Sequence, residues 1–313
     1  MALLRCAVIG VGYLGKFHAQ KYAKIPECQL VAVVDSLQAQ ADVVAGPLGC
    51  AALTDYRDLL GKVDAVSIVV PTQGHYDVCA EFLRAGVHVL VEKPMTTTLA
   101  QADELIRLAK EHHCVLAVGH LERFNPAALA LEPLLSDPRF IDSSRLAPFK
   151  PRATDVSVLL DLMIHDVDLI LSLVDSELES VDCSGARVLT SDIDIANARI
   201  RFANGCVANV TASRVSAKSE RKMRVFQSQA CHSLDFQART LTTYRGTTHS
   251  QAEPEQSIER HEQSFGEADP LFSEILDFVN SIRNKRPPKV SGEAGRRALE
   301  AVQRITEATR LIS

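Results

Sequence analysis

A lysine at the end of an apolar segment is the first candidate for chemistry in this chain. The run Val87–Val91 is followed by Glu92, Lys93 and Pro94, and the proline stiffens the backbone that orients the lysine. A lysine shielded from water loses its proton more readily, so Lys93 could shuttle a proton or donate a hydrogen bond to a reacting oxygen. The alternative is an exposed Glu-Lys pair at a strand end.

A second candidate group consists of Asp161, His165 and Asp168. Their spacing places all three on one face of a helix that we expect over Val158–Val174. A neutral His165 could take the proton of an alcohol, with Asp161 holding or polarising its partner. A polar stripe where the helix meets solvent explains the same spacing, and the sequence leaves both interpretations open.

A glycine-rich turn suggests what the reaction partner is. Gly10-Val11-Gly12-Tyr13-Leu14-Gly15 follows an apolar run directly and precedes a predicted helix. The first glycine permits a tight turn, the second lets a pyrophosphate approach, and the third lets helix and strand pack closely. Asp35 follows at the end of the next run, 20 residues beyond Gly15, where a carboxylate binds a ribose diol and repels a 2′-phosphate. Ser36, and the absence of Arg or Lys beside Asp35, add to a prediction of NAD rather than NADP.

Two further segments follow predicted strands, and the carboxyl ends of parallel strands face the ligand crevice. Pro71, Thr72 and His75 either border the nicotinamide half of the cofactor or begin an ordinary turn and helix. Arg123 and Asn125 lie where the chain leaves the first sheet. They could meet substrate oxygens or fix a hinge between domains.

The elements that must position these residues are visible as two patterns. Over residues 1–120, nearly continuous apolar runs alternate with amphipathic helical segments. This alternation predicts a parallel sheet covered on both faces, a Rossmann-type α/β domain that binds the dinucleotide. The runs are Leu4–Ile9, Leu30–Val34, Ala65–Val70, Val87–Val91 and Val115–Val118.

From residue 121 to 313 the pattern predicts an α+β domain with a mainly antiparallel sheet. Apolar and polar residues alternate on both sides of Asn204-Gly205, which predicts a hairpin with two positive-φ residues in a tight turn. Further strands are expected at 224–228, 233–236 and 240–244, a loop at 247–267, and closing helices at 271–283 and 292–311.

Composition limits the remaining possibilities. The 313 residues are 46% hydrophobic and 23% charged, enough for two cores, and the net charge of −5 does not fit a general nucleic-acid binder. The eight cysteines lack metal-ligand spacing, and no segment resembles a signal peptide or a membrane span. We therefore expect free thiols, no metal, no nucleic-acid or membrane partner, and a reducing, cytoplasmic location.

Four segments together resemble the Gfo/Idh/MocA family of NAD(P)-dependent oxidoreductases: the glycine motif, Pro71 to His75, Glu92-Lys93-Pro94, and Asp161 to His165. The resemblance implies a Rossmann domain followed by a substrate-binding and oligomerisation domain with a large open sheet, which pairs into homodimers or homotetramers. It also implies that Lys93, Asp161 and His165 are catalytic and that the Lys93-Pro94 bond is cis. Met163 is a departure, because many members carry glycine there.

Within the family, residues 118–126 and 145–168 are similar to members that oxidise the C3 hydroxyl of UDP-N-acetylglucosamine. The expected product is a ketone that a partner aminotransferase converts into a 3-amino sugar for lipid A or a related glycan. The two charges of a UDP-sugar need cations outside the first domain. The candidates are Lys150 and Arg152, or a group comprising Arg214, Lys218, Arg221, Lys222 and Arg224.

Two alternatives remain from the sequence. An inositol, a hexose or a UDP-sugar uronate could replace the substrate without changing the chemistry. A non-catalytic NAD-binding regulator could use the same architecture, although the presence of Lys93, Asp161 and His165 together favours an enzyme.

Overall fold

The computed structural model describes residues 2–149, 157–246 and 258–312 of the chain. It divides into two compact units. The first consists of Met1–Leu121 and Asp269–Arg296, and the second of Glu122–Ala268 and Arg297–Ser313. All of residues 121–313 were predicted to belong to the second domain. The structure instead assigns 269–296 to the first unit, because the chain returns there.

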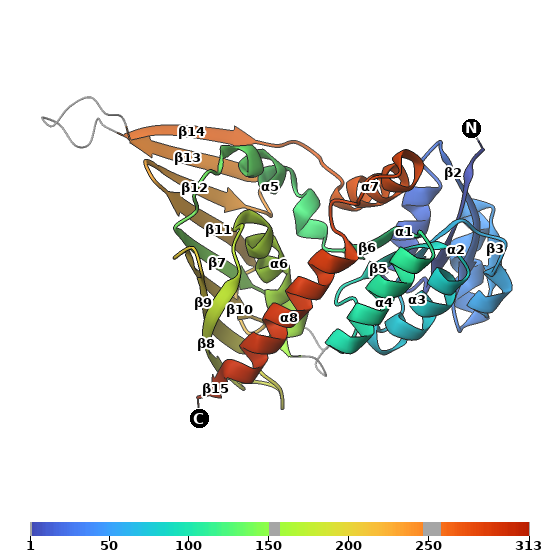
Figure 1. The fold of residues 1–313 in the computed structure, drawn as a ribbon, viewed down its shortest axis with the longest axis horizontal. Helices are drawn as coiled ribbons and strands as arrows, with labels where there is room; N and C mark the ends of the chain where they lie inside the picture. Colours follow the sequence, from blue (N-terminus) through green and yellow to red (C-terminus); the bar gives the residue numbers. More distant parts are fainter. Residues whose placement is uncertain (1, 150–156, 247–257, 313) are drawn as a thin grey trace, which may run out of the picture. The chain divides into compact units, whose positions relative to one another are not determined.

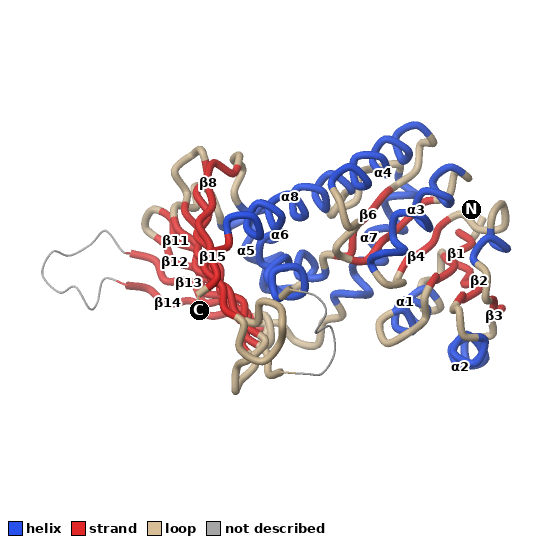
Figure 2. Tube along the Cα trace, turned by 90° about the horizontal axis from the view of Figure 1, so that it is seen from below, coloured by secondary structure: helices blue, strands red, loops and turns tan. Residues whose placement is uncertain are grey.

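The first unit contains a six-stranded parallel sheet, as predicted, in the order β3-β2-β1-β4-β5-β6. Helices α1 and α2 lie on one face of this sheet and α3 and α4 on the other (Figures 1 and 2). The strands are β1 (Leu4–Ile9), β2 (Cys28–Val34), β3 (Ala51–Leu53), β4 (Ala65–Ile68), β5 (His88–Glu92) and β6 (Leu116–Gly119). The helices are α1 (Gly15–Tyr22), α2 (Gln38–Leu48), α3 (His75–Arg84), α4 (Leu99–Glu111) and α7 (Pro270–Asn284).

Burial on both faces explains why these strands form. All four residues of β4 are buried, as are the three central residues of β5, so neither strand has a polar face to turn toward water. The returning helix α7 extends this core through Leu271, Ile275 and Phe278. Asp269 caps its first turn by accepting a hydrogen bond from the N–H of Phe272 at 3.0 Å.

The second unit is built on a nine-stranded mixed sheet that is mostly antiparallel, as predicted. Its order is β14-β13-β12-β11-β7-β10-β9-β8-β15, and helices cover one of its faces (Figure 2). The strands are β7 (Phe140–Leu146), β8 (Leu178–Ala186), β9 (Ile195–Phe202), β10 (Val207–Ser213), β11 (Glu220–Gln227), β12 (Ala230–Asp235), β13 (Thr240–Gly246), β14 (Ile258–Ser264) and β15 (Thr309–Leu311). The helical elements are α5 (Pro126–Leu131), a π-helical turn (Leu159–Met163) and α6 (Ile164–Leu173), while α8 (Gly292–Ala308) begins in the first unit and ends in the second.

Alternation along β9 and β10 gives this sheet its buried face. Ala196, Ala198, Ile200 and Phe202 are each at most 1% exposed, and they pack in one core with residues of α6 and α8. The intervening side chains are polar. A period of two therefore separates the core from the opposite face of the sheet.

Two expectations for this unit were wrong. The segment 247–267 was predicted to be a loop, and its residues 247–257 lie outside the described part of the chain. Ile258–Ser264 instead forms β14, whose side chains are all exposed and so show no periodicity. The last predicted helix ends at Ala308, after which Thr309–Leu311 adds a parallel strand beside β8. Strands β7 and β8 were not predicted.

The β9–β10 hairpin forms, but its turn differs from the prediction. Only Gly205 has a positive φ, of +87°, while Asn204 uses its side chain to accept the N–H of Cys206 at 3.1 Å. Phe202 donates to Cys206 O at 2.9 Å, which leaves three residues in the loop. A three-residue hairpin loop of this kind needs one left-handed residue, whereas the predicted two-residue turn needs two.

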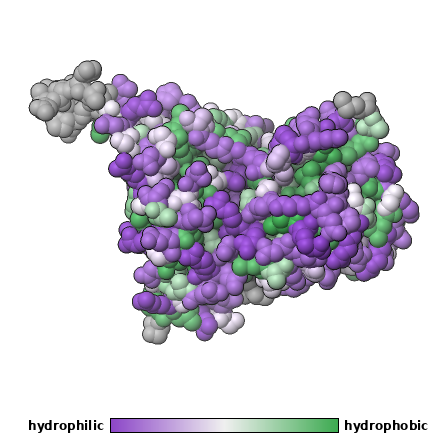
Figure 3. Space-filling model, in the orientation of Figure 1, coloured by the Kyte–Doolittle hydropathy of each residue, from purple (hydrophilic) through white to green (hydrophobic). Residues whose placement is uncertain are grey.

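The cysteines are free thiols, as predicted, and the face of the molecule seen in Figure 3 is mostly polar. Hydrophilic residues make up most of the face drawn in Figure 3, with smaller apolar groups between them. All eight cysteines are free thiols. Among the described residues, the structure has no helix with the length and apolar character needed to cross a membrane.

The hairpin turn gives a test of backbone strain. A Cβ on Gly205 would meet no atom within 4 Å, so Gly205→Ala changes only the energy of the left-handed backbone. We expect a loss of about 1 kcal/mol in the free energy of unfolding, measured by urea denaturation. Gly266→Ala is the control, since Gly266 also has open space but no positive φ. Equal effects of the two variants would contradict this explanation.

Candidate functional site

The turn after β1 has the geometry that the glycine motif predicts. Gly10 has a φ of +83°, and a Cβ there would lie 2.7 Å from the carbonyl oxygen of Val69. A Cβ on Gly15 would lie 1.8 Å from the oxygen of Gly10, whereas one on Gly12 would meet nothing within 4 Å. Open space therefore lies beside the start of α1, where helix N–H groups and the helix dipole favour a phosphate.

Asp35 connects the end of β2 to this turn. Its carboxylate accepts hydrogen bonds from the N–H groups of Val11 and Leu37, both at 3.1 Å. These bonds fix the side chain beside the glycine turn. A carboxylate has further lone pairs that can accept hydrogen bonds from a ribose diol.

A cavity of about 830 Å³ adjoins the glycine turn and Asp35, which is large enough for part of a dinucleotide. Of the predicted cofactor-binding residues, Gly10, Gly12, Asp35 and Pro71 line it. Tyr13 and Leu14 lie in the turn before α1, Gly15 begins α1, and Thr72 follows Pro71. None of these four residues is in the lining.

One wall of this cavity, formed by residues 54–57, was not predicted. These residues follow β3, a strand of three residues that is too short to give a periodic signal. Arg57 is the notable member, because it brings a cation to the cavity that Asp35 lines. Its guanidinium lies 4.8 Å from the ring centre of Tyr56 and forms ion pairs with Glu81 at 3.3 Å and Asp55 at 3.5 Å.

His75 is placed inside the protein. The residue is 1% exposed, and its two ring nitrogens lie 2.9 Å from the carbonyl oxygens of Val70 and Pro94. Burial is the main reason that the pKa of His75 is below its usual value. The ring therefore ties the end of β4 to the segment that follows Lys93.

Glu92 points toward α1, and its carboxylate is 14% exposed. It lies 3.1 Å from Nε2 of the buried His18 and accepts the N–H of Lys93 at 3.3 Å. Burial opposes its ionisation, but the hydrogen bond and charge of His18, with Lys93, hold the pKa of Glu92 below its usual value. The next bond, Lys93-Pro94, is cis, as the family resemblance implied.

A second carboxylate, that of Glu274, lies close to Glu92 and His18. Ligand atoms of His18, Glu92 and Glu274 all lie within 4.8 Å of one another, and Glu274 is 3% exposed. Such a group could coordinate a metal, but the hydrogen bond between His18 and Glu92 already accounts for its closest contact. His18, Glu92 and Glu274 are called the charge cluster below, and within it His18 fixes Glu92, which accepts the N–H of Lys93.

The second unit contains the other predicted catalytic residues. Asp161 lies in the π-helical turn and His165 in the first turn of α6, where a continuous α-helix was predicted. π-helical turns are rare and often occur at functional sites. Both side chains are partly exposed, whereas Asp168 is buried. Lys93 belongs to the first unit, whereas Asp161 and His165 belong to the second.

A buried charge network holds the start of α6. Arg145 of β7 is 3% exposed and binds both carboxylate oxygens of Asp166, at 2.7 and 3.2 Å. It also donates to Glu122 at 3.0 Å. Burial opposes its charge, but the two carboxylates raise the pKa of Arg145 above its usual value. The neighbour of His165 is thus fixed to the sheet.

Arg123 and Asn125 have contacts within their own unit. Arg123 forms an ion pair with Asp168 at 3.3 Å, and the two side chains are 11% and 3% exposed. Asn125 is 5% exposed and caps α5 by accepting the N–H of Ala127 at 3.1 Å. It also donates to Phe236 O at 3.2 Å. These contacts fix both side chains within the second unit. That they also meet substrate oxygens stays a prediction.

Only some of the cations that were expected to bind the substrate diphosphate lie among the described residues. Lys150 and Arg152 lie outside the described residues. In the second group, Arg214 is buried against Asp194 at 2.9 Å, and ion pairs join Arg221 to Glu122, Lys222 to Glu220 and Arg224 to Asp142. Lys218 is exposed.

Comparison with known proteins gives a consistent result. Residues 4–120 match a family model described as "Oxidoreductase family, NAD-binding Rossmann fold", and residues 137–233 match the "GFO/IDH/MocA C-terminal domain". The chain is 43% identical over 307 residues to UDP-N-acetylglucosamine 3-dehydrogenase from Acidithiobacillus ferrooxidans, covering 97% of each. A solved structure of that enzyme superimposes with a TM-score of 0.92, at 42% identity, over 99% of this chain and 98% of that chain.

More distant relatives act on cyclic polyols. The chain is 31% identical over 233 residues to the NAD-dependent scyllo-inositol 2-dehydrogenase of Bacillus subtilis, covering 68% of each. A structure of scyllo-inositol dehydrogenase from Lactobacillus casei, with bound NAD(H) and scyllo-inositol, has a TM-score of 0.82 at 22% identity, over 98% of this chain and 97% of that one. The latter likeness concerns the fold alone.

The glycine turn allows cofactor binding to be separated from folding. We expect Gly12→Ala to raise the Kd for NAD about tenfold or more, because a methyl group there occupies the open space beside α1. Its free energy of unfolding should change by less than about 0.5 kcal/mol. Gly15→Ala should instead destabilise the fold, since its Cβ collides with backbone. Calorimetric titration and urea denaturation measure the two effects. A Gly12→Ala variant with unchanged affinity would contradict the assignment.

The Arg145 network predicts a large stability effect. Arg145→Met leaves the carboxylates of Asp166 and Glu122 buried without their cation, so we expect the free energy of unfolding to fall by about 3–5 kcal/mol. Arg224→Met is the control within the same sheet, because the ion pair of Arg224 with Asp142 is exposed, and its loss should cost less than about 1 kcal/mol. Similar losses in urea denaturation would show that the buried network has no special role.

Proposed function

The chain belongs to the Gfo/Idh/MocA family of oxidoreductases, and we propose that it uses NAD to oxidise the C3 hydroxyl of UDP-N-acetylglucosamine to a ketone. The observation that carries this proposal is the 43% identity to an enzyme of that name across 97% of both chains. The product would be consumed by an aminotransferase that installs a 3-amino group, as in lipid A or a related glycan.

Lys93, Asp161 and His165 are the residues to which we assign the chemistry. NAD, when bound, accepts a hydride from the carbon that is oxidised. The chain must then remove the hydroxyl proton, and a lysine or a histidine can each do so. Asp161 would orient or polarise its partner. The tie from His75 to Pro94 and the pairing of Glu92 with His18 support a fixed backbone at Lys93.

Two features support NAD rather than NADP. The carboxylate of Asp35 faces the same cavity as the glycine turn, and its charge would repel a 2′-phosphate. Arg57 lines that cavity too, but Glu81 and Asp55 already compensate its charge. Gly10, Gly12 and Asp35 therefore form the adenosine and pyrophosphate part of the proposed site. We assign Pro71 to its nicotinamide part.

The substrate diphosphate and the assembly of the enzyme complete the proposal. Most cations of β10–β11 are already paired with carboxylates, so we assign the diphosphate to Lys150 and Arg152. We further propose that the enzyme is a homodimer or homotetramer formed through the face of the nine-stranded sheet that helices leave uncovered (Figure 2).

The test is turnover by the purified full chain. With NAD and UDP-N-acetylglucosamine we expect growth of reduced-nicotinamide absorbance, strengthened by a carbonyl trap that removes the ketone.

Lys93→Met should lower kcat by about 10²–10⁴-fold while the Kd for NAD is unchanged. The pH profiles of Lys93 and His165 variants then identify the base. Reaction with scyllo-inositol but not the nucleotide sugar would overturn the substrate. Absence of turnover with either substrate would favour a regulator.

A further inference from the structure

A second cavity, of about 710 Å³, lies in the first unit away from the glycine turn. Its lining includes His88, the first residue of β5, and Val115 and Leu116 at the start of β6. The dinucleotide cavity lies at the carboxyl ends of the strands and shares no lining residue with it. The two cavities therefore lie at opposite ends of the strands of the same sheet.

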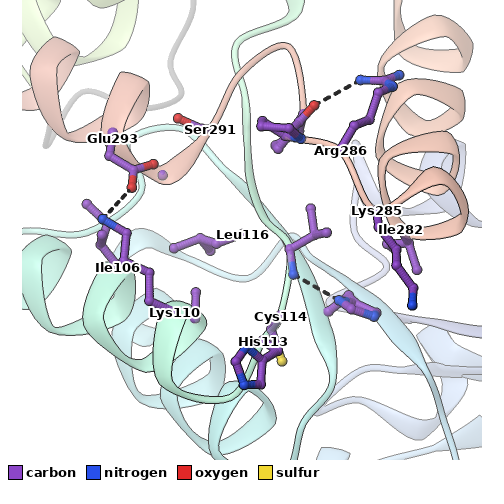
Figure 4. A pocket seen from close by; sticks show the side chains of 16 residues that line it. Ile106, Lys110, His113, Cys114, Leu116, Ile282, Lys285, Arg286, Ser291 and Glu293 are labelled. Carbon is purple, nitrogen blue, oxygen red and sulfur yellow. Dashed lines mark hydrogen bonds and ion pairs between the residues drawn. The ribbon is translucent and has the colours of Figure 1, made fainter.

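The second cavity has an apolar floor and a basic rim. Leu116 lies near its centre, with Ile106 from α4 at one side and Ile282 from α7 at the other (Figure 4). Three cationic side chains, Lys110, Lys285 and Arg286, line it against a single carboxylate, Glu293. A binding site of this composition fits a molecule that is apolar at one end and anionic at the other.

Most of the rim charges are already compensated. Lys110 and Glu293 form an ion pair at 2.9 Å (Figure 4), and Arg286 binds Asp277 at 2.6 Å. Lys285 is exposed and forms no ion pair with any of the residues described by the structure. The cavity therefore presents one uncompensated ammonium group.

His88 contributes a neutral donor. Its Nδ1 accepts the N–H of Val115 at 2.8 Å, which requires the proton of the neutral ring to be on Nε2. Burial holds the pKa of His88 below its usual value, which favours this neutral form. A ring N–H in the lining of the cavity can donate to an anionic oxygen.

The backbone supplies an independent observation. Helices α2, α3, α4 and α7 all end with the same turn, in which an N–H reaches back five residues to a carbonyl oxygen, at 2.8–3.4 Å. The left-handed residue of that turn is glycine after α2 and α3, namely Gly49 and Gly86, but His113 after α4 and Lys285 after α7.

The two exceptions have a common location. A left-handed conformation disfavours any residue with a Cβ, and glycine at these positions would be the less strained choice. His113 and Lys285, with φ values of 55° and 51°, both line the cavity. The two ends that carry glycine do not line it. The two helix ends that carry this conformational cost are therefore the two whose side chains line the cavity.

We propose that this cavity binds a small amphipathic anion, a carboxylate or a phosphate monoester on an apolar body. Its anionic group meets Lys285, His88 and His113, and its apolar part rests on Ile106, Leu116 and Ile282. The site is separate from the proposed catalytic site and does not depend on the proposed reaction.

Fluorescence titration with anilinonaphthalene sulfonate, an amphipathic anion, tests this proposal on the full chain. Saturating NAD and UDP are present throughout, so that the nucleotide sites are filled. We expect saturable binding at one site. Benzoate or phenyl phosphate should displace the dye, and their relative potency distinguishes a carboxylate from a phosphate ligand. Benzyl alcohol, the neutral counterpart, should not displace it.

Lys285→Gly is the decisive variant, because glycine suits the left-handed backbone and the protein should unfold at the same or a higher temperature. We expect it to weaken dye binding about tenfold, and His113→Gly to weaken it less. Lys24→Ala, which removes an exposed lysine elsewhere in the same unit, should leave binding unchanged. Unchanged affinity in Lys285→Gly, equal displacement by benzyl alcohol, or an absence of saturable binding would each overturn the proposal.

Discussion

The buried carboxylate of Glu92 is the interaction on which the first unit's site depends. A charge at the end of a parallel strand must be paired if it is to be withdrawn from water. His18 provides that pairing from α1, the helix that the glycine turn begins. Gly119 of β6 leaves the space that the carboxylate occupies, because a Cβ there would lie 2.8 Å from Glu92 Oε1. The contact between His18 and Glu92 thus joins the helix that follows the glycine turn to the backbone of Lys93.

The second unit also buries a charge, but there the charge is a cation. Its sheet buries the guanidinium of Arg145, and the charge is tolerated because Asp166 and Glu122 surround it. Asp166 and Asp168 follow His165 along α6, and each is held by an arginine. The segment that carries Asp161 and His165 is therefore anchored through its neighbours. The two side chains themselves remain partly exposed.

The sequence predicted elements wherever burial imposes a period. The continuous runs of β1, β4 and β5 and the alternation of β9 and β10 were recognisable because one or both faces are buried. β14 was missed because all its side chains are exposed, and residues 54–57 because the strand before them is short. Types and spacing identified Lys93, Asp161, His165 and Asp35. Types and spacing could not show that Arg123 forms an ion pair with Asp168 or that Glu92 contacts His18.

The return of the chain to the first unit is the feature that local patterns could not predict. A periodic apolar face shows that α7 must pack on something but does not identify its partner. The structure pairs Lys21 with Asp269 at 2.5 Å and places Phe278 in the core that includes Tyr22 and Val8. Residues 1–121 alone would leave that face of α1 uncovered. The return also brings Glu274 to His18 and Glu92, so the charge cluster behind Lys93 is completed by residues from the opposite end of the chain.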